Sequence, residues 1–370
     1  MTGADGRRDA AADPLDLSGI ERVAAVVLSR EVGDFIAGGS GRERSLAANR
    51  AAFDAVFVRP RVLADVSGCA PDSTLLGRPA RMPLAVGPVA YHRLAHPDGE
   101  LATARAAKAA GVPFTLAMLS SVPVEEVTAV GGAVWFQLYW LRDTGRTLEL
   151  ARRAEDAGCE ALVLTVDVPW MGRRLRDVRN GFALPDGVRA AHLGDAPSAA
   201  HRGGAGASAV AAHTAELFSP SLTWTDVERL RTATRLPLVL KGVLDPEDAR
   251  RAVEYGADAL VVSNHGGRQL DGAVPGLLAL PAVREAVGAA YEVLVDGGVR
   301  GGTDVLKALA LGASGVLVGR PPVWGLATGG EDGVRRVLEL FAAELTDALG
   351  LAGCATPAEA RRLTTVTVRP

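Results

Sequence analysis

Eight short apolar runs, each separated from the next by a segment of helical character, constrain the fold of this 370-residue chain more than any other feature. Such alternation is typical of a parallel sheet covered by helices, and eight is the strand number of a closed barrel. The predicted strands cover residues 82–86, 113–117, 133–138, 161–166, 236–240, 259–262, 292–295 and 315–318. We therefore expect an α/β fold of the (β/α)₈ TIM-barrel class. A doubly wound open sheet is the alternative that shares the alternation.

Helix signals lie between these runs. Asp245-Pro246 places a capping residue before a first-turn proline, and the Ala-rich stretch that follows ends at Gly256. Similar patterns predict helices over residues 147–158 and 302–312.

The chain is long for one domain, but barrels of this class reach this length. We expect residues 1–15 to form a disordered tail and residues 16–370 to form a single barrel domain. The connection over residues 175–222 carries Gly203-Gly204-Ala205-Gly206 and many Ala and Ser. This composition predicts an irregular, lid-like segment after the fourth strand, on the face where barrel active sites lie.

Charge and cysteine usage exclude several classes of partner. With 40 basic and 43 acidic residues the net charge is −3, so no broad basic field predicts binding to nucleic acid or to an anionic membrane. Cys69, Cys159 and Cys354 lack CxxC spacing, which predicts neither a disulfide framework nor a metal site and fits a reducing cytoplasm. No apolar run reaches the roughly 18 residues of a membrane span, so we expect a soluble cytoplasmic protein.

The segment Ser263-Asn264-His265-Gly266-Gly267-Arg268-Gln269 follows a predicted strand directly. Because active sites of parallel barrels lie at the carboxyl ends of the strands, His265 and Arg268 are candidate active-site residues. The guanidinium matches a carboxylate and the imidazole accepts a proton near neutral pH, which together suit an acid with a proton to lose. Taken alone, the pair could equally be a turn cap and a surface ion pair.

Polar residues follow the other predicted strands in the same way. Gly-rich turns with an arginine follow the seventh and eighth strands, where barrels of this class commonly hold phosphate, although either turn alone could be a tight turn without a ligand. The candidates that converge on one mouth are Pro88, Val89, Ala90, Gln137, Tyr139, Thr165, Asp167, Lys241, Ser263, His265, Arg268, Asp296, Gly298, Arg300, Gly319 and Arg320.

These motifs resemble those of the FMN-dependent α-hydroxy acid oxidase and dehydrogenase family, which includes glycolate oxidase, lactate oxidase and mandelate dehydrogenase. The resemblance runs from about Asp34 to about Leu340. It is carried, besides the SNHGGRQ segment, by DFIAGG, AHPDGE, FQLYW, LTVDVPWMGRR, LVLKGV, LVDGGVRGGTDVLKALALGA and VLVGRP. Several further stretches resemble the 4-hydroxymandelate oxidase branch of that family most.

The resemblance implies a bound FMN and assigns residues to it. It places Lys241 at the N1–C2=O edge of the flavin, Gln137 and Thr165 at the pyrimidine end, and the backbone of residues 88–90 beside N5. It also implies that the ribityl phosphate is held by Asp296, Gly298, Arg300, Gly319 and Arg320, with Ser263 counted among the cofactor-binding residues.

For catalysis the resemblance implies that His265 removes the α-hydroxyl proton and that Asp167 stabilises the resulting imidazolium. Arg268 would bind the substrate carboxylate, with Arg173 as a second substrate-binding residue and Tyr139 hydrogen-bonded to the substrate oxygen.

Two positions depart from the glycolate oxidase pattern. Phe35 stands where the family has a carboxylate-binding tyrosine, and Ala117 where a serine contacts the flavin. Losing the tyrosine hydroxyl removes a donor and makes the pocket wall more apolar, which favours an aryl substrate. Candidates for an aryl-sized pocket are Tyr91, Leu119, Trp140, Trp170 and Met171, although such residues are often ordinary packing.

We therefore expect oxidation of an (S)-2-hydroxy acid of the mandelate type to the 2-oxo acid, with dioxygen reduced to hydrogen peroxide, by a homotetramer. A dehydrogenase that uses a quinone or protein acceptor and an oxidatively decarboxylating monooxygenase are the alternatives within the same chemistry. An isoprenoid diphosphate isomerase or nucleotide-processing barrel could share the phosphate turns but has no use for the His-x-x-Arg pair. A non-catalytic FMN-binding protein would keep its role without His265.

Overall fold

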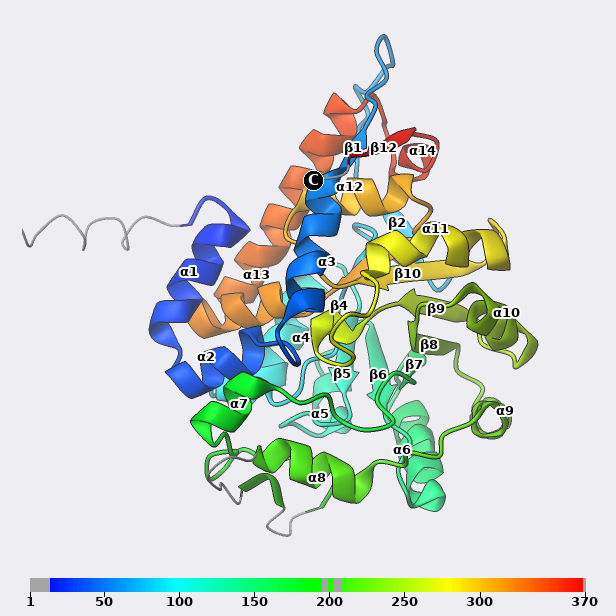
Figure 1. Cartoon of the computed structure of the whole chain (residues 1–370). Helices are drawn as coiled ribbons and strands as arrows, with labels where there is room; N and C mark the ends of the chain where they lie inside the picture. Colours follow the sequence, from blue (N-terminus) through cyan, green and yellow to red (C-terminus); the bar gives the residue numbers. More distant parts are fainter. Residues whose placement is uncertain (1–13, 195–198, 202–207, 369–370) are drawn as a thin grey trace, which may run out of the picture.

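The barrel strands form because their residues are almost all apolar and are covered on both faces, as is typical of parallel strands. The computed structural model describes residues 14–194, 199–201 and 208–368. Its eight parallel strands close into a barrel in the order β10, β11, β4, β5, β6, β7, β8, β9 (Figure 1). The strands are β4 (Leu84–Val86), β5 (Phe114–Ala117), β6 (Val134–Leu138), β7 (Ala161–Thr165), β8 (Leu238–Val243), β9 (Ala259–Val262), β10 (Glu292–Asp296) and β11 (Gly315–Val318). The TIM-barrel prediction is confirmed, and the open sheet is excluded.

Helices surround the barrel and bury its outer surface. They are α4 (Gly99–Ala109), α5 (Val124–Thr128), α6 (Thr144–Asp156), α9 (Trp224–Ala233), α10 (Pro246–Glu254), α11 (Gly276–Val287), α12 (Gly302–Ala310) and α13 (Arg320–Leu351). Asp245 caps α10 by accepting a hydrogen bond from the Glu247 N–H, as the Asp-Pro pair predicts. A smaller apolar cluster that includes Trp135, Val239 and Leu294 fills the inside of the barrel. The barrel is therefore a packed core rather than a channel.

Within the described residues, three helices precede the barrel strands. They are α1 (Leu17–Val27), α2 (Arg30–Ala37) and α3 (Arg44–Ala55). Helix α1 lies along α13, and α3 contacts the turn η3 (His265–Gly267) that follows β9 (Figure 1). Helix α3 is thereby brought to the carboxyl ends of the strands.

The remaining elements are short. Strand β1 (Val56–Val58) pairs antiparallel with β12 (Thr365–Thr367), and β2 (Ser73–Leu75) with β3 (Arg78–Ala80). The turn η1 (His92–Leu94) follows β4, and α14 (Pro357–Ala360) precedes β12. No helix within the described ranges combines the length and apolar composition that crossing a membrane requires.

The connection over residues 175–222, predicted to be irregular, also contains regular elements in its described part. It contains α7 (Leu175–Asn180), η2 (Ala199–His201) and α8 (Ala209–Leu217), and Phe218 forms a β-bridge with Leu141. Alanine has the highest helix propensity of all residues. The Ser208 side chain caps α8 by accepting a hydrogen bond from the Ala211 N–H. The glycines at positions 203, 204 and 206 that suggested irregularity lie outside the described residues. So do residues 1–13 of the predicted tail.

Candidate active site

A pocket opens at the carboxyl ends of the barrel strands, where the sequence places the candidate residues. Its wall combines strand ends, the turns that follow them, and side chains from α2 and α8. Of the predicted residues it is lined by Phe35, Pro88, Val89, Ala90, Gln137, Tyr139, Thr165, Lys241, His265, Arg268, Asp296, Gly298, Arg300, Gly319 and Arg320. Asp167 and Ser263 lie directly behind this wall and bond to residues that form it.

His265 and Asp167 form a hydrogen-bonded pair. The His265 Nδ1 lies 3.0 Å from Asp167 Oδ1, and the Ser263 hydroxyl accepts the His265 backbone N–H at 2.9 Å. Burial lowers the pKa of His265 below its ordinary value, although Asp167 opposes this shift. The imidazole is therefore neutral near pH 7 and can accept a proton. His265 has a φ of +59°, a left-handed conformation that is uncommon for a non-glycine residue.

Lys241 is a buried cation with a fixed carboxylate partner. Its Nζ lies 3.0 Å from Asp296 Oδ2 and donates to the Ser263 hydroxyl at 3.1 Å. Burial would lower the pKa of Lys241, but Asp296 and Asp167 raise it above its ordinary value, so the ammonium stays charged. Strand β8 is longer than predicted because its pairing with β9 continues past a bulge after Lys241. Gly242 makes this possible: a Cβ there would lie 2.6 Å from the Asp167 Cβ.

Gln137 and Thr165 are polar residues at the ends of apolar strands. The Gln137 amide donates to the Thr165 hydroxyl at 3.0 Å and accepts from the Met118 N–H at 3.2 Å. These bonds satisfy the two side chains within the protein while both still face the pocket.

Two half-buried arginines donate to main-chain carbonyl groups rather than to carboxylates. Arg268 Nη1 donates to the Gly38 carbonyl at 2.6 Å, and Arg320 donates to the Ile36 and Gly38 carbonyls at 3.0 and 3.1 Å. Those carbonyls end α2, the negative end of its dipole. Burial, followed by repulsion from neighbouring arginines, lowers the pKa of Arg320 well below its ordinary value. Unbalanced positive charge of this kind predicts bound anions.

Of two adjacent arginines, Arg174 lines the pocket and Arg173, the predicted substrate-binding residue, does not. The Arg173 side chain is exposed. Burial, and then the nearby Arg268, lower the pKa of Arg174 to about 9. Its buried Nε has no hydrogen-bond partner among the described residues, which fits a donor reserved for a ligand.

Phe35 forms an apolar wall beside these arginines. It is 4% exposed, stacks on Phe182 with ring centroids 4.5 Å apart, and lies 5.5 Å from the Arg268 guanidinium carbon. Ala117, at the other departure from the glycolate oxidase pattern, also lines the pocket.

The rest of the apolar wall is only partly as predicted. Of the aryl-pocket candidates, Tyr91, Leu119 and Met171 line the pocket; Trp140 does not, and Trp170 is 73% exposed. Sequence reasoning missed Phe218, on which Tyr139 stacks at 4.3 Å, together with Val210 and Thr214 of α8. The sequence signal for these residues was an alanine-rich stretch in which Val210 and Thr214 stand four residues apart, the spacing of one helix face.

The phosphate turns fit the group predicted for them. Gly298 has a φ of +91°, and a Cβ there would lie 2.3 Å from the Asn49 carbonyl oxygen, so only glycine allows this close approach. Arg300 and Arg320 both face the pocket, where their charge suits a phosphate. The buried Asp296 Oδ1 has no partner among the described residues, and as an anionic acceptor it suits a ribityl hydroxyl rather than the predicted phosphate. No group of three or more His, Cys, Asp or Glu side chains in the described ranges is arranged to hold a metal ion.

Fold and site together define a (β/α)₈-barrel enzyme whose Gly-rich turns can hold a phosphate-bearing cofactor. Beside these turns lie a histidine base and arginines that have no carboxylate partner among the described residues. A family model described as FMN-dependent dehydrogenase matches residues 24–366, and the chain belongs to that family. Its cofactor is FMN, as predicted.

Known relatives cover nearly the whole chain. It is 62% identical over 351 residues to 4-hydroxymandelate oxidase of Amycolatopsis orientalis, which covers 95% of this chain and 98% of the relative. It is 48% identical over 350 residues to L-lactate oxidase of Nostoc sp., covering 93% and 96% of the two chains. The crystal structure of mandelate oxidase with (S)-4-hydroxymandelic acid matches with a TM-score of 0.94 at 62% identity, covering 96% of this chain and 99% of the other.

Proposed function

We propose that this enzyme oxidises an aromatic (S)-2-hydroxy acid of the mandelate type to the 2-oxo acid and reduces dioxygen to hydrogen peroxide. FMN-dependent oxidation of a 2-hydroxy acid is the coarser activity, common to the oxidases that the chain resembles. The aryl preference and dioxygen as acceptor are the finer parts of the proposal.

One observation carries the proposal: a neutral base and two arginines without carboxylate partners face the same pocket. His265 can accept the α-hydroxyl proton, while Arg268 and Arg174 can hold the carboxylate of the same molecule. A 2-hydroxy acid carries both groups on one carbon, so the pocket matches its shape and charge.

The chain's own residues perform the proton chemistry. The α-hydroxyl proton passes to Nε2 of His265, and Asp167 stabilises the imidazolium through its bond to Nδ1. Tyr139 lines the same pocket and, with its pKa raised by burial, stays a neutral phenol that can donate to the substrate oxygen. Bound FMN would supply the acceptor for the hydride equivalent lost from Cα and the two-electron reduction of dioxygen, and the proton held by His265 would complete the hydrogen peroxide. Lys241 would lie beside the flavin as a fixed positive charge.

Apolar side chains support the aryl preference. Phe35, Leu119, Met171 and Phe218 face the pocket, and Phe35 replaces a hydroxyl donor that a small hydroxy acid would use. The relative named 4-hydroxymandelate oxidase and the mandelate oxidase structure with (S)-4-hydroxymandelic acid support the same choice.

The decisive experiment is anaerobic bleaching of the flavin absorbance by (S)- and (R)-mandelate, 4-hydroxymandelate, lactate and glycolate, followed by admission of air. We expect one enantiomer of an aryl acid to bleach the flavin fastest, with rapid recovery of colour and one hydrogen peroxide per 2-oxo acid. Slow recovery in air would identify a dehydrogenase, and release of carbon dioxide a monooxygenase. No bleaching by any acid would refute the proposal.

The homotetramer and the cytoplasmic location also remain proposals. They rest on the family resemblance and on the three cysteines without paired spacing. Light scattering on the purified holoenzyme would decide the first, and cell fractionation the second.

A further inference from the structure

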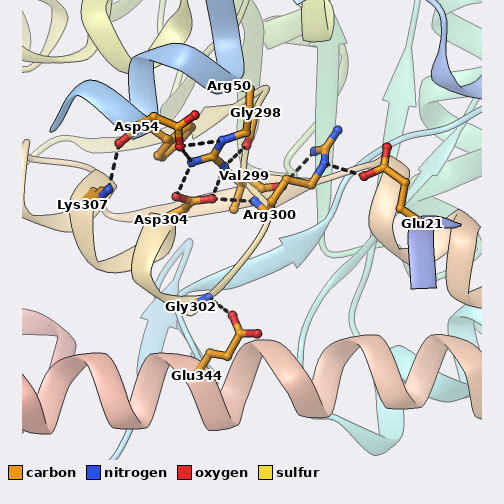
Figure 2. A network of polar contacts seen from close by, with 11 residues as sticks. Glu21, Arg50, Asp54, Gly298, Val299, Arg300, Gly302, Asp304, Lys307 and Glu344 are labelled. Atoms are coloured by element: carbon orange, nitrogen blue, oxygen red, sulfur yellow. Dashed lines mark hydrogen bonds and ion pairs between the residues drawn. The ribbon is translucent and has the colours of Figure 1, made fainter. Parts of the chain in front are cut away.

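Arg50 lies near the middle of α3, outside the active-site pocket, yet it contacts the phosphate turn (residues 296–300). Its Nη1 donates to the Gly298 carbonyl at 2.8 Å (Figure 2). The same guanidinium is bidentate with Asp304 in the first turn of α12: Nη2 donates to Oδ1 at 2.9 Å and Nη1 to Oδ2. Asp54, one turn further along α3, accepts from Nη2 at 2.9 Å.

We propose that Arg50 and Asp304 clamp the phosphate turn in the conformation that receives the FMN phosphate, which makes Arg50 a positioning residue for the cofactor. The inference rests on FMN as the cofactor and is independent of which hydroxy acid is oxidised. It adds to the cofactor site two residues that do not touch the pocket.

Asp304 connects the clamp to the residue that faces the phosphate. Its Oδ2 accepts the Arg300 backbone N–H at 2.8 Å, so one carboxylate binds both Arg50 and the main chain of Arg300 (Figure 2). The Asp304 side chain is only 8% exposed, and a buried carboxylate is costly without a cationic partner. Removing Arg50 would leave this charge uncompensated and the turn held by fewer bonds.

The N-terminus of α12 supports this interpretation. The Gly302 N–H is already bonded to Glu344 of α13 at 2.8 Å, and the Arg300 N–H to Asp304. These donors are therefore engaged by the protein, and their bonds fix the turn. Recognition of the phosphate is left to the arginine side chains and to the rest of the two Gly-rich turns.

The neighbouring residue on α3 reaches the catalytic turn instead. Asn49 and Asn264 exchange two amide hydrogen bonds of 2.9 and 2.8 Å, and Asn264 also accepts the Gly267 N–H. The Asn49 main chain also packs against Gly298, but the side-chain hydrogen bonds of Arg50 and Asn49 go to different turns. A change of the Arg50 side chain therefore allows the effect of the clamp to be separated from an effect on His265.

The test compares FMN with riboflavin, which carries the same ring without the phosphate. Arg50→Ala, Arg50→Lys and Asp304→Asn are made in the full-length chain, with Arg105→Ala as control because Arg105 forms an exposed ion pair with Glu331 of α13. Release of FMN from each holoenzyme is followed by the rise in flavin fluorescence. Dissociation constants of both flavins are then measured on the deflavinated full-length proteins by quenching of the same fluorescence.

We expect Arg50→Ala to weaken FMN binding by about 10- to 100-fold, the effect of losing a charge-assisted pair, with riboflavin binding unchanged. Arg50→Lys and Asp304→Asn should also weaken FMN binding more than riboflavin binding, to a smaller degree. In the Arg50→Lys/Asp304→Asn double variant, the loss of FMN binding free energy should be smaller than the sum of the two single losses. Equal weakening of both flavins would assign Arg50 to general stability, and unchanged FMN binding would remove it from the site; either result overturns the proposal. If Arg50→Ala does not fold, Arg50→Lys and Asp304→Asn decide the matter alone.

Discussion

Two sets of charged groups in the pocket differ in how their charge is balanced. The paired set, Lys241 with Asp296 and His265 with Asp167, has protein partners at 3.0 Å. The arginine set consists of Arg174, Arg268 and Arg320; within the described part of the chain, none of these forms an ion pair with a carboxylate. Apart from the buried Lys241, the members of both sets are half-buried, so the difference does not come from exposure to solvent.

The difference shows what each set is built to do. An ionised partner inside the protein keeps Lys241 charged before a ligand arrives and stabilises the imidazolium that His265 forms when it accepts a proton. A guanidinium that donates only to carbonyl groups keeps uncompensated charge, which an anionic ligand neutralises. On the proposed function, the paired set would therefore serve proton and electron transfer, and the arginine set would bind carboxylate and phosphate.

The largest effect is expected from the paired set. His265→Asn should retain FMN but slow flavin reduction by about 10²- to 10⁴-fold, because FMN binding and proton removal use different residues. Asparagine tolerates the left-handed backbone at this position better than alanine, so His265→Ala serves as the second variant. Anaerobic stopped-flow bleaching measures the rate, and visible absorbance reports the bound flavin. Reduction at the wild-type rate would assign the base to another group.

The arginine set offers an adjacent pair of residues as its own control. Arg174→Ala should lower kcat/KM for the hydroxy acid by about 10- to 100-fold through loss of a charge-assisted bond to the carboxylate. Arg173→Ala should leave kcat/KM unchanged because that side chain is exposed. Steady-state kinetics with each variant measure both values. Equal losses at the two positions would mean that neither arginine binds the carboxylate directly.

This pair also marks where prediction from the sequence ends. Apolar runs locate the strands to within a few residues because parallel strands buried on both faces must be apolar throughout. Residues 166–174 form no regular element, so no periodicity indicates which of two adjacent arginines faces inward. The motif places both at the site, and only the folded loop selects Arg174.

Contacts between residues far apart in the chain could not be predicted from the sequence for a different reason. Arg50 meets Gly298 and Asp304 across 248 and 254 residues, and α3 lies outside the repeating strand and helix pattern. The distinction between pocket wall and supporting residue was also missed: Ser263 and Asp167 were grouped with the wall but act behind it. The position of a residue along a strand predicts at which end of the barrel its side chain lies. It does not predict whether that side chain faces the pocket or lies behind the pocket wall.

Within the paired set, the pH dependence should separate Asp167 from His265. In the wild type, kcat/KM should fall as the pH drops through a value below the ordinary histidine pKa, because only the neutral imidazole accepts the proton. Asp167 raises the pKa of His265, so Asp167→Asn should lower that pKa further and move the acid limb to lower pH. The reduction rate at its plateau should fall about 10-fold because the imidazolium loses a charge-assisted bond. An acid limb that stays in place would show that the titrating group is not His265.

The smallest effect concerns Phe35, which borders the arginine set without carrying charge. Phe35→Tyr supplies a hydroxyl near Arg268 and Arg174, whose guanidinium carbons lie 5.5 and 6.0 Å from the ring centroid, while Phe182 keeps the ring stacked. One added hydrogen bond of about 1 kcal/mol should raise the ratio of kcat/KM for lactate to that for mandelate by about 5-fold. Phe57→Tyr, the same change on the exposed strand β1, should leave the ratio unaltered. If Phe35→Tyr also leaves it unaltered, position 35 does not set the substrate class, and the preference for aryl acids must come from other apolar residues of the pocket such as Leu119 and Phe218.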